Sequence, residues 1–234
     1  MLVDAGDFSA DVALEAQARN KWVLEGLRRM DYAAINIGEL EVIEETERWK
    51  ELGGADLPWI STNAVLPAGS PVQPRPYIIQ EIQSARGRTV RVGFLGLAAP
   101  APAGLAIEFA DPVERARSYA AELAGRVDVL VALAQMTVED ARELVKAAPA
   151  IDIVLGAEKD TQTIEPLFEG DSLILYPVSQ GMTLGDLRLF FGDDGRPSRF
   201  FFRVVPLPSE LEDHPDWVEF QQQAESEIKA AKSP

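Results

Sequence analysis

Leu2-Val3-Asp4-Ala5-Gly6-Asp7-Phe8 opens the chain with a short apolar run that stops at the turn Ala5-Gly6-Asp7. The run predicts a buried strand over residues 1–4, and the turn places an acidic side chain at the strand's carboxyl end. Ligands collect at such strand ends in open α/β sheets, so Asp7 is a candidate site residue. Its alternative role is to cap the helix that follows, because Asp is a favoured N-cap residue.

The same alternation of short apolar runs and amphipathic stretches continues along the chain and predicts an α/β fold. We expect helices over 10–30, 42–52, 111–125, 137–147 and 215–231. We expect strands over 1–4, 32–37, 59–65, 77–82, 90–97, 127–133, 151–155, 172–178, 184–191 and 199–205. Residues 1–205 are predicted to form one domain, and residues 206–234 a C-terminal tail whose surface helix is anchored by Trp217 and Phe220.

Charge and composition exclude several classes of function. The chain has 22 basic and 38 acidic residues, for a net charge of −16, which argues against binding nucleic acid. It has no cysteine, which excludes disulfides, thiolate zinc sites and cysteine nucleophiles. No apolar run reaches the roughly 18 residues of a membrane helix, so we expect no membrane insertion, and we find no signal peptide. The single histidine, His214, precedes a predicted helix among acids and is interpreted as a surface or capping group.

Several strand ends, read in order, resemble the catalytic domain of the 5′-nucleotidase family, within the calcineurin-like metallophosphoesterase fold. The matching blocks are Leu2 to Phe8, Ala34 to Glu41, Pro58 to Asn63, Val92 to Leu97, Val129 to Met136, Asp152 to Asp160, Leu173 to Leu189 and Val205 to Ala230. The resemblance implies a layered α/β/β/α sandwich of mixed sheets flanked by helices. It covers nearly the whole chain, and the order and spacing of the blocks make it more specific than any one block.

The departures from this family concern its metal ligands. The resemblance implies that Asp7 keeps the position of the aspartate that bridges two metals. Leu40 stands where the family has its transition-state histidine. Four further ligand positions carry oxygen donors in place of the family's asparagine and histidines: Glu39, Gln135, Glu158 and Asp160. The family's first block, an Asp-x-His strand, and its C-terminal nucleotide-binding domain are absent from this sequence.

A two-metal hydrolase holds its ions about 3.5–4 Å apart and lowers the pKa of a bound water. Imidazole suits zinc, manganese and iron, whereas oxygen ligands suit calcium, magnesium or manganese. Leu40 also removes a proton donor, a group worth roughly 10² to 10⁴ in rate. We therefore interpret the chain as a degenerate, non-catalytic binding or structural module. The alternative is a phosphoester hydrolase with an oxygen-rich metal site.

For the non-catalytic interpretation we expect no cofactor. For the alternative, Asp7, Glu39, Gln135, Glu158 and Asp160 would hold Mn²⁺, Mg²⁺ or Ca²⁺. The same acids could instead be solvated loop residues in a chain that is acidic throughout. Lys159, between two of the acids, would partly neutralise them and favours this second interpretation.

The resemblance also places the missing first strand beside residues 2–4. We therefore expect an upstream segment or a protein partner to complete the sheet there, because an unpaired strand edge is an aggregation hazard. Family membership would further imply export or a periplasmic location. Near the other end of the chain, Phe201 is predicted to face away from Phe200 and Phe202, so one face of that strand needs a second layer or a partner.

Overall fold

A computed structural model describes residues 1–9, 15–43, 46–52, 54–100, 107–158, 161–177, 182–193, 195–208, 210 and 212–232, with the side chains of residues 42, 43 and 46–48 left out. Its helices are α1 (Ala16–Arg29), α2 (Glu39–Ile43), α3 (Thr46–Glu51), α4 (Pro112–Leu123), α5 (Val138–Ala147) and α6 (Pro215–Ala231). Its first strands are β1 (Leu2–Asp4), β2 (Tyr32–Asn36), β3 (Trp59–Ile60), β4 (Ala64–Val65), β5 (Tyr77–Gln83), β6 (Thr89–Ala98) and β7 (Glu108–Phe109). The later strands are β8 (Val129–Gln135), β9 (Ile153–Ala157), β10 (Leu167–Glu169), β11 (Ser172–Leu175), β12 (Thr183–Phe191) and β13 (Pro197–Pro206).

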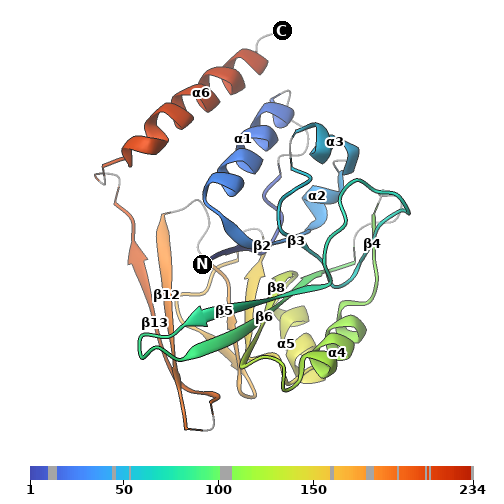
Figure 1. Ribbon diagram of the computed structural model, residues 1–234, viewed down its shortest axis with the longest axis vertical. Helices are drawn as coiled ribbons and strands as arrows, with labels where there is room; N and C mark the ends of the chain where they lie inside the picture. The colour runs from blue at the N-terminus through green and yellow to red at the C-terminus, as the bar shows by residue number, and fades with distance from the viewer. Residues whose placement is uncertain are drawn as a thin grey trace.

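Two sheets lie between two layers of helices (Figure 1). The smaller sheet has the order β1-β2-β3 and its strands are parallel. The larger sheet has the order β10-β11-β9-β8-β6-β5, with parallel pairs at its centre and an antiparallel strand at each end. Helices α1, α2 and α3 lie on one side of this pair of sheets, and α4 and α5 lie on the other. The predicted α/β/β/α sandwich is therefore confirmed, with one mixed sheet and one parallel sheet.

Three apolar cores separate these four layers. Leu24, Ile35 and Trp59 belong to the core between the small sheet and its helices. A second core joins the two sheets, and a third joins the large sheet to α4 and α5. Successive residues of β8 alternate between the last two cores, because neighbouring side chains of a strand point to opposite faces. Both faces of β8 are buried, which explains its nearly continuous apolar sequence.

Local sequence signals position most of the helices. Asp111 accepts hydrogen bonds from two N–H groups of the first turn of α4, where Pro112 needs no partner. Thr137 caps α5 by accepting from the Asp140 N–H at 3.1 Å. His214 caps α6 through Nδ1, which accepts from the Asp216 N–H at 3.3 Å. The interpretation of His214 as a capping group is confirmed.

The strand predicted over residues 59–65 is wrong as a single element. Two two-residue strands, β3 and β4, form there and belong to different sheets. Between β3 and β4, side chains accept hydrogen bonds from the backbone of β6. Thr62 Oγ1 accepts from the Gly96 N–H, and Asn63 Oδ1 accepts from the Ala98 N–H, both at 3.1 Å. These bonds turn the chain across the end of β6. Of the helix predicted over 42–52, the described residues form part of α2 and all of α3, while residues 44 and 45 lie outside the described part of the chain.

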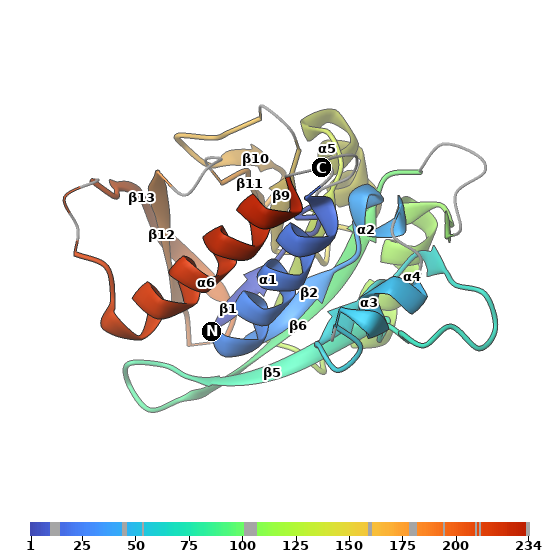
Figure 2. The ribbon, with the colours of Figure 1, turned by 90° about the horizontal axis from the view of Figure 1, so that it is seen from above.

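Helix α6 packs along α1 (Figure 2), as the predicted anchors require. The ring of Phe220 contacts Trp22 edge-on at 5.1 Å between centroids, and Trp217 contacts Phe220 at 5.0 Å. Lys21 forms an ion pair with Glu227 at 2.7 Å. None of the residues of α6 is fully buried, so the helix lies on the surface of the sandwich.

Two glycine substitutions should change stability in opposite directions. A Cβ at Gly156 would overlap the ring of Tyr176, which is itself buried, so Gly156→Ala should lower the free energy of unfolding by about 3 kcal/mol. A Cβ at Gly26, inside α1, would make an ordinary 3.7 Å contact with Phe220. Gly26→Ala should therefore raise stability by up to about 1 kcal/mol through helix propensity. Chemical denaturation measures both, and equal effects would contradict this packing.

Candidate functional site

The turn after β1 and the start of α2 lie against each other at the carboxyl ends of β1 and β2. Asp7 Oδ1 accepts a hydrogen bond from the Leu40 N–H at 2.9 Å. Burial raises the pKa of the Asp7 carboxyl, and the backbone N–H groups of Leu40 and Glu39 partly offset this. Asp7 and Glu39, which the sequence predicted as neighbours in one site, are therefore brought together. The contact runs through the backbone of α2, so one Asp7 oxygen is already engaged by the protein.

Glu41 makes the converse contact from α2 to the β1 turn. Its buried carboxylate accepts from the Asp7 N–H at 2.7 Å, the Gly38 N–H at 2.8 Å and the Ser9 N–H at 3.0 Å. Burial raises the pKa of Glu41, while the three N–H donors lower it and the nearby Asp7 charge adds to the rise. We call these four hydrogen bonds, three to Glu41 and one to Asp7, the carboxylate lock. The lock holds the turn after β1, which carries Asp7, against the start of α2, which carries Glu39.

Glycine is required where these turns meet. Gly6 has a φ of +94° and Asp7 one of +70°, so both residues adopt the left-handed conformation. A Cβ on Gly38 would lie 2.7 Å from the Asp7 nitrogen and 3.0 Å from Glu41 Oε2. Only a glycine therefore lets α2 approach the β1 turn closely enough for the lock to form.

Asn36 joins the two sheets at the same end of the sandwich. Its buried Nδ2 donates to the Ala5 carbonyl and to the Leu97 carbonyl, each at 3.0 Å. Among the described residues its Oδ1 has no hydrogen-bond partner, and it faces Gly96, where a Cβ would overlap it. No site role was predicted for Asn36 or Glu41 from the sequence. A signal was present, because each is a polar residue in or beside a strand predicted to be buried.

Two of the other predicted ligands, Gln135 and Glu158, lie at the ends of β8 and β9. Gln135 is the last residue of β8 and is half-buried. Glu158 follows β9, and its Oε2 accepts from the Thr161 hydroxyl at 2.7 Å. Tyr176 fills the space beside these ends, with its hydroxyl donating to the Met136 carbonyl at 2.9 Å. Burial, together with the nearby Glu158 charge, strongly raises the pKa of Tyr176, so the phenol stays protonated.

Within the described part of the chain, no three His, Cys, Asp or Glu side chains lie close enough to hold a metal ion together. Asp160 and Lys159 lie outside the described residues. The complete set of Asp7, Glu39, Gln135, Glu158 and Asp160 therefore stays a prediction. The predicted metal ligands in the described part of the chain offer only oxygen atoms. The single histidine, His214, is not among them because it caps α6.

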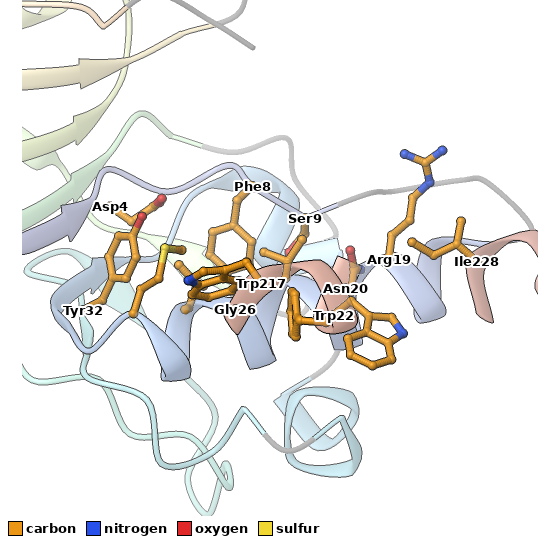
Figure 3. Close-up of a pocket in the computed structure, with 14 residues that line it drawn as sticks. Asp4, Phe8, Ser9, Arg19, Asn20, Trp22, Gly26, Tyr32, Trp217 and Ile228 are labelled. Carbon is orange, nitrogen blue, oxygen red and sulfur yellow. The ribbon is translucent and has the colours of Figure 1, made fainter. Parts of the chain in front are cut away.

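Two cavities lie near β1. The first, which we call the strand slot, has a volume of about 640 Å³ and lies between β1, β9, β11, β12 and β13. The second, the helix groove, has a volume of about 590 Å³ and lies between α1, α6 and the ends of β1 and β2 (Figure 3). Figure 3 shows aromatic rings around the helix groove, among them Phe8, Trp22, Tyr32 and Trp217. Asp4 is the one carboxylate among the described lining residues of each cavity, so neither has the lining of a metal centre.

Removing the carboxylate of Glu41 should destabilise the protein. In Glu41→Gln one of the two carboxylate oxygens becomes an NH2 group, which would face at least one buried backbone N–H donor and leave it without an acceptor, so we expect a loss of about 3 kcal/mol in the free energy of unfolding. Denaturant titration measures the loss. The matched control is Glu39→Gln, two residues away and half-buried, which should change stability by less than about 0.5 kcal/mol. Similar values for the two variants would show that the lock does not hold the turns.

No family model matches this sequence, and no curated protein matches it. Solved structures do match its fold. A 5′-nucleotidase precursor from Thermus thermophilus superposes with a TM-score of 0.79 at 18% identity, over 97% of this chain and 49% of that one. The sulfate thiohydrolase SoxB, also from Thermus thermophilus, gives a TM-score of 0.76 at 18% identity, over 100% of this chain and 42% of that one.

A calcineurin-like phosphoesterase, YfkN from Bacillus subtilis, gives a TM-score of 0.73 at 18% identity and covers 100% of this chain and 85% of that one. The chain thus spans less than half the length of the two Thermus proteins. At these identities the likeness concerns the fold. The expectation drawn from the strand ends is confirmed at that level: the chain has a calcineurin-like metallophosphoesterase fold of the 5′-nucleotidase type.

Proposed function

We propose that this chain is a degenerate 5′-nucleotidase-like domain that does not hydrolyse phosphoesters and works as a binding or structural module. The observation that carries the proposal is the carboxylate lock. In it the backbone N–H groups of Asp7, Ser9 and Gly38 and the Glu41 carboxylate tie the β1 turn directly to α2. The protein's own groups therefore hold this edge together.

The residue chemistry at the edge supports the same conclusion. Leu40 is a hydrocarbon side chain between Glu39 and Glu41, at the position where the resemblance implies a proton donor. General acid–base catalysis needs a titratable group within hydrogen-bond reach of the reacting oxygen. Gln135 and Glu158 offer oxygens in place of imidazole, and oxygen ligands favour hard cations that lower the pKa of water less than zinc does.

The second candidate function is a metal-dependent phosphoester hydrolase with an oxygen-rich site. Asp7 favours it, because this residue keeps the position of the bridging aspartate and has one carboxylate oxygen outside the bond to Leu40. Asp7, Glu39, Gln135, Glu158 and Asp160 would then hold Mn²⁺, Mg²⁺ or Ca²⁺. For the non-catalytic module we propose no cofactor.

An activity assay separates the two candidates. Purified protein is incubated with an aryl phosphate ester and with a nucleoside monophosphate, while Mn²⁺, Mg²⁺ and Zn²⁺ are added in turn. We expect no turnover above that of Asp7→Ala with any metal. The matched control is Glu143→Ala on the exposed face of α5, which should behave as the parent protein does.

Metal-dependent turnover that is lost in Asp7→Ala and kept in Glu143→Ala would reject the non-catalytic proposal. Two equivalents of transition metal in elemental analysis of the purified protein would count against it as well. Activity that survives in Asp7→Ala would point to a contaminating phosphatase, because the proposed metal site could not produce it.

We also propose that an added strand completes the small sheet beside residues 2–4. Strand β1 pairs with β2, and β12 pairs with β13; among the described strands, none pairs with the other edge of either. The strand slot lies between these two open edges, lined by Val3 and Leu187 at its sides and by Leu133 and Leu155 beneath. The added strand would come from a segment preceding Met1 or from a protein partner.

Hydrogen exchange tests the added strand. We would fuse a five-residue Val/Thr segment to the N-terminus through a short glycine linker. If it enters the slot, the amides of β1 and of Thr183–Leu187 should exchange at least about tenfold more slowly, because both edges gain backbone hydrogen bonds. The control replaces two residues of the segment with proline, which has no backbone N–H group to donate to a neighbouring strand. Unchanged exchange in both fusions would contradict the proposal.

We place the domain outside the cytoplasm as part of the same proposal. The description of the Thermus 5′-nucleotidase as a precursor supports this, since a precursor is processed after synthesis. In the described part of the chain, none of the helices is long and apolar enough to cross a membrane. Cell fractionation of the producing organism, followed by immunodetection, would test the location.

A further inference from the structure

Strands β12 and β13 form a separate antiparallel hairpin whose two faces differ. Directly opposed residues of an antiparallel pair lie on the same face, so the register assigns each side chain. One face carries Leu187, Leu189 and Phe191, which pack against the core between the two sheets. The opposite face carries Leu184, Asp186, Arg188, Phe190, Arg199, Phe201 and Arg203. We call this second set the arginine–phenylalanine face.

Apolar groups on the arginine–phenylalanine face are exposed. Leu184 is 56% exposed, and Phe190 and Phe201 are each 46% exposed. Single exposed apolar residues are ordinary, but these three lie on one face of one hairpin. The hairpin needs only its other face to join the core. One face of β13 was predicted to need a second layer or a partner, and the described residues provide that layer on the Leu187 side.

The face is preorganised by cross-strand contacts. The guanidinium of Arg188 lies 5.9 Å from the ring centroid of Phe201, and that of Arg199 lies 5.7 Å from the centroid of Phe190. Asp186 pairs with Arg188 at 2.8 Å and with Arg203 at 3.0 Å, and the Arg188 hydrogen bond is the main reason that its pKa lies below the usual range. These contacts hold flexible side chains in place, which reduces the entropy that a partner must overcome on binding.

The charge of this face is opposite to that of the chain as a whole. Its three arginines and one aspartate carry a net charge of +2, whereas the chain carries −16 and its remainder therefore −18. Among the described residues Arg199 has no carboxylate partner, and its guanidinium contacts a ring instead. A cationic strip on an anionic body selects for an anionic partner and orients it toward the strip.

We propose that the arginine–phenylalanine face binds an acidic segment of a partner protein, one that carries apolar side chains between its carboxylates. The carboxylates would pair with Arg188, Arg199 and Arg203, and the apolar side chains would cover Phe190 and Phe201. A nucleic-acid strand fits less well. The remaining charge of −18 repels a long polyanion, and one aspartate lies among the three arginines of the face.

A second copy of the chain also fits less well than an acidic partner segment. Two molecules with a net charge of −16 repel each other at every distance beyond the local contact. Two copies of this face would, in addition, bring arginine strips against each other. The partner that the charges favour is therefore a short acidic segment whose own total charge is small enough to approach.

Synthetic peptides test the proposal with the full chain. The probe is a twelve-residue peptide that alternates Glu with Phe or Leu, labelled for fluorescence anisotropy. Two matched peptides replace Glu with Lys, or Phe and Leu with Ser. We expect the Glu–Phe/Leu peptide to bind most tightly, and its dissociation constant to rise at least tenfold in the charge-reversal variant Arg199→Glu/Arg203→Glu. Raising the salt concentration should weaken binding, because exposed charge pairs are screened.

Two further variants keep the result interpretable. Arg115→Glu, on an exposed position of α4, makes a single charge change away from the hairpin and should leave binding unchanged. Arg199→Gln/Arg203→Gln removes charge without reversing it and should weaken binding by less than the Glu pair does. Thermal unfolding of each variant reports whether the hairpin still folds.

Four results would overturn the proposal. They are peptide binding that is unchanged in both hairpin variants, equal binding of the Lys peptide, and tighter binding of oligothymidylate than of the acidic peptide. The fourth is self-association in sedimentation experiments that disappears in the Arg199→Glu/Arg203→Glu variant, because it would assign the face to a second copy.

Discussion

The carboxylate of Glu41 sets the geometry at the carboxyl end of the small sheet. A buried carboxylate is costly unless hydrogen bonds satisfy it, and Glu41 has three backbone N–H donors from two separate turns. The donors can reach it only because Gly6 and Gly38 lack side chains where the turns meet. The positions of Asp7, Glu39 and Leu40 follow from this contact. Asn36 then joins the same end to the large sheet, so the edge where a metal centre would lie is held by protein groups.

The residues that specify the fold are different from the residues at the strand ends, where a metal site would lie. Three apolar cores between four layers specify the sandwich, and none of them contains Asp7, Glu39, Leu40, Gln135 or Glu158. Ligand positions at strand ends can therefore change from imidazole to carboxylate, amide or leucine without loss of the architecture. The likeness to a nucleotidase and a phosphoesterase at 18% identity shows that the fold persists at low sequence identity.

The hairpin of β12 and β13 stands apart from both sheets in its hydrogen bonding. Its inner face is fixed by the core between the sheets, whereas its outer face is organised by arginine, phenylalanine and aspartate pairs across the strands. One edge of the same hairpin borders the strand slot. The two surfaces that we propose for other polypeptides thus meet on one element.

Much of the fold could be predicted from the sequence. Alternating short apolar runs predicted the order of strands and helices, and Thr137, Asp111 and His214 marked helix starts that the structure confirms. The short strands β7 and β10 and the break between β3 and β4 could not be predicted. Their limits depend on partners far along the chain, as where Asn63 bonds to Ala98 and Ala110. Periodicity measures local preference and carries no information about such partners.

For the candidate site, the sequence alone determined which donor atoms the chain can offer: oxygens from carboxylates and amides, one histidine and no thiol. It also placed Asp7, Glu39, Gln135 and Glu158 at strand ends. Only the tertiary structure decided which of these groups meet, and that Glu41, with the backbone of two turns, occupies the contact between Asp7 and α2. The physical reason is that a hydrogen bond between residues thirty-odd positions apart depends on how the strands pack, whereas donor chemistry depends on residue type alone.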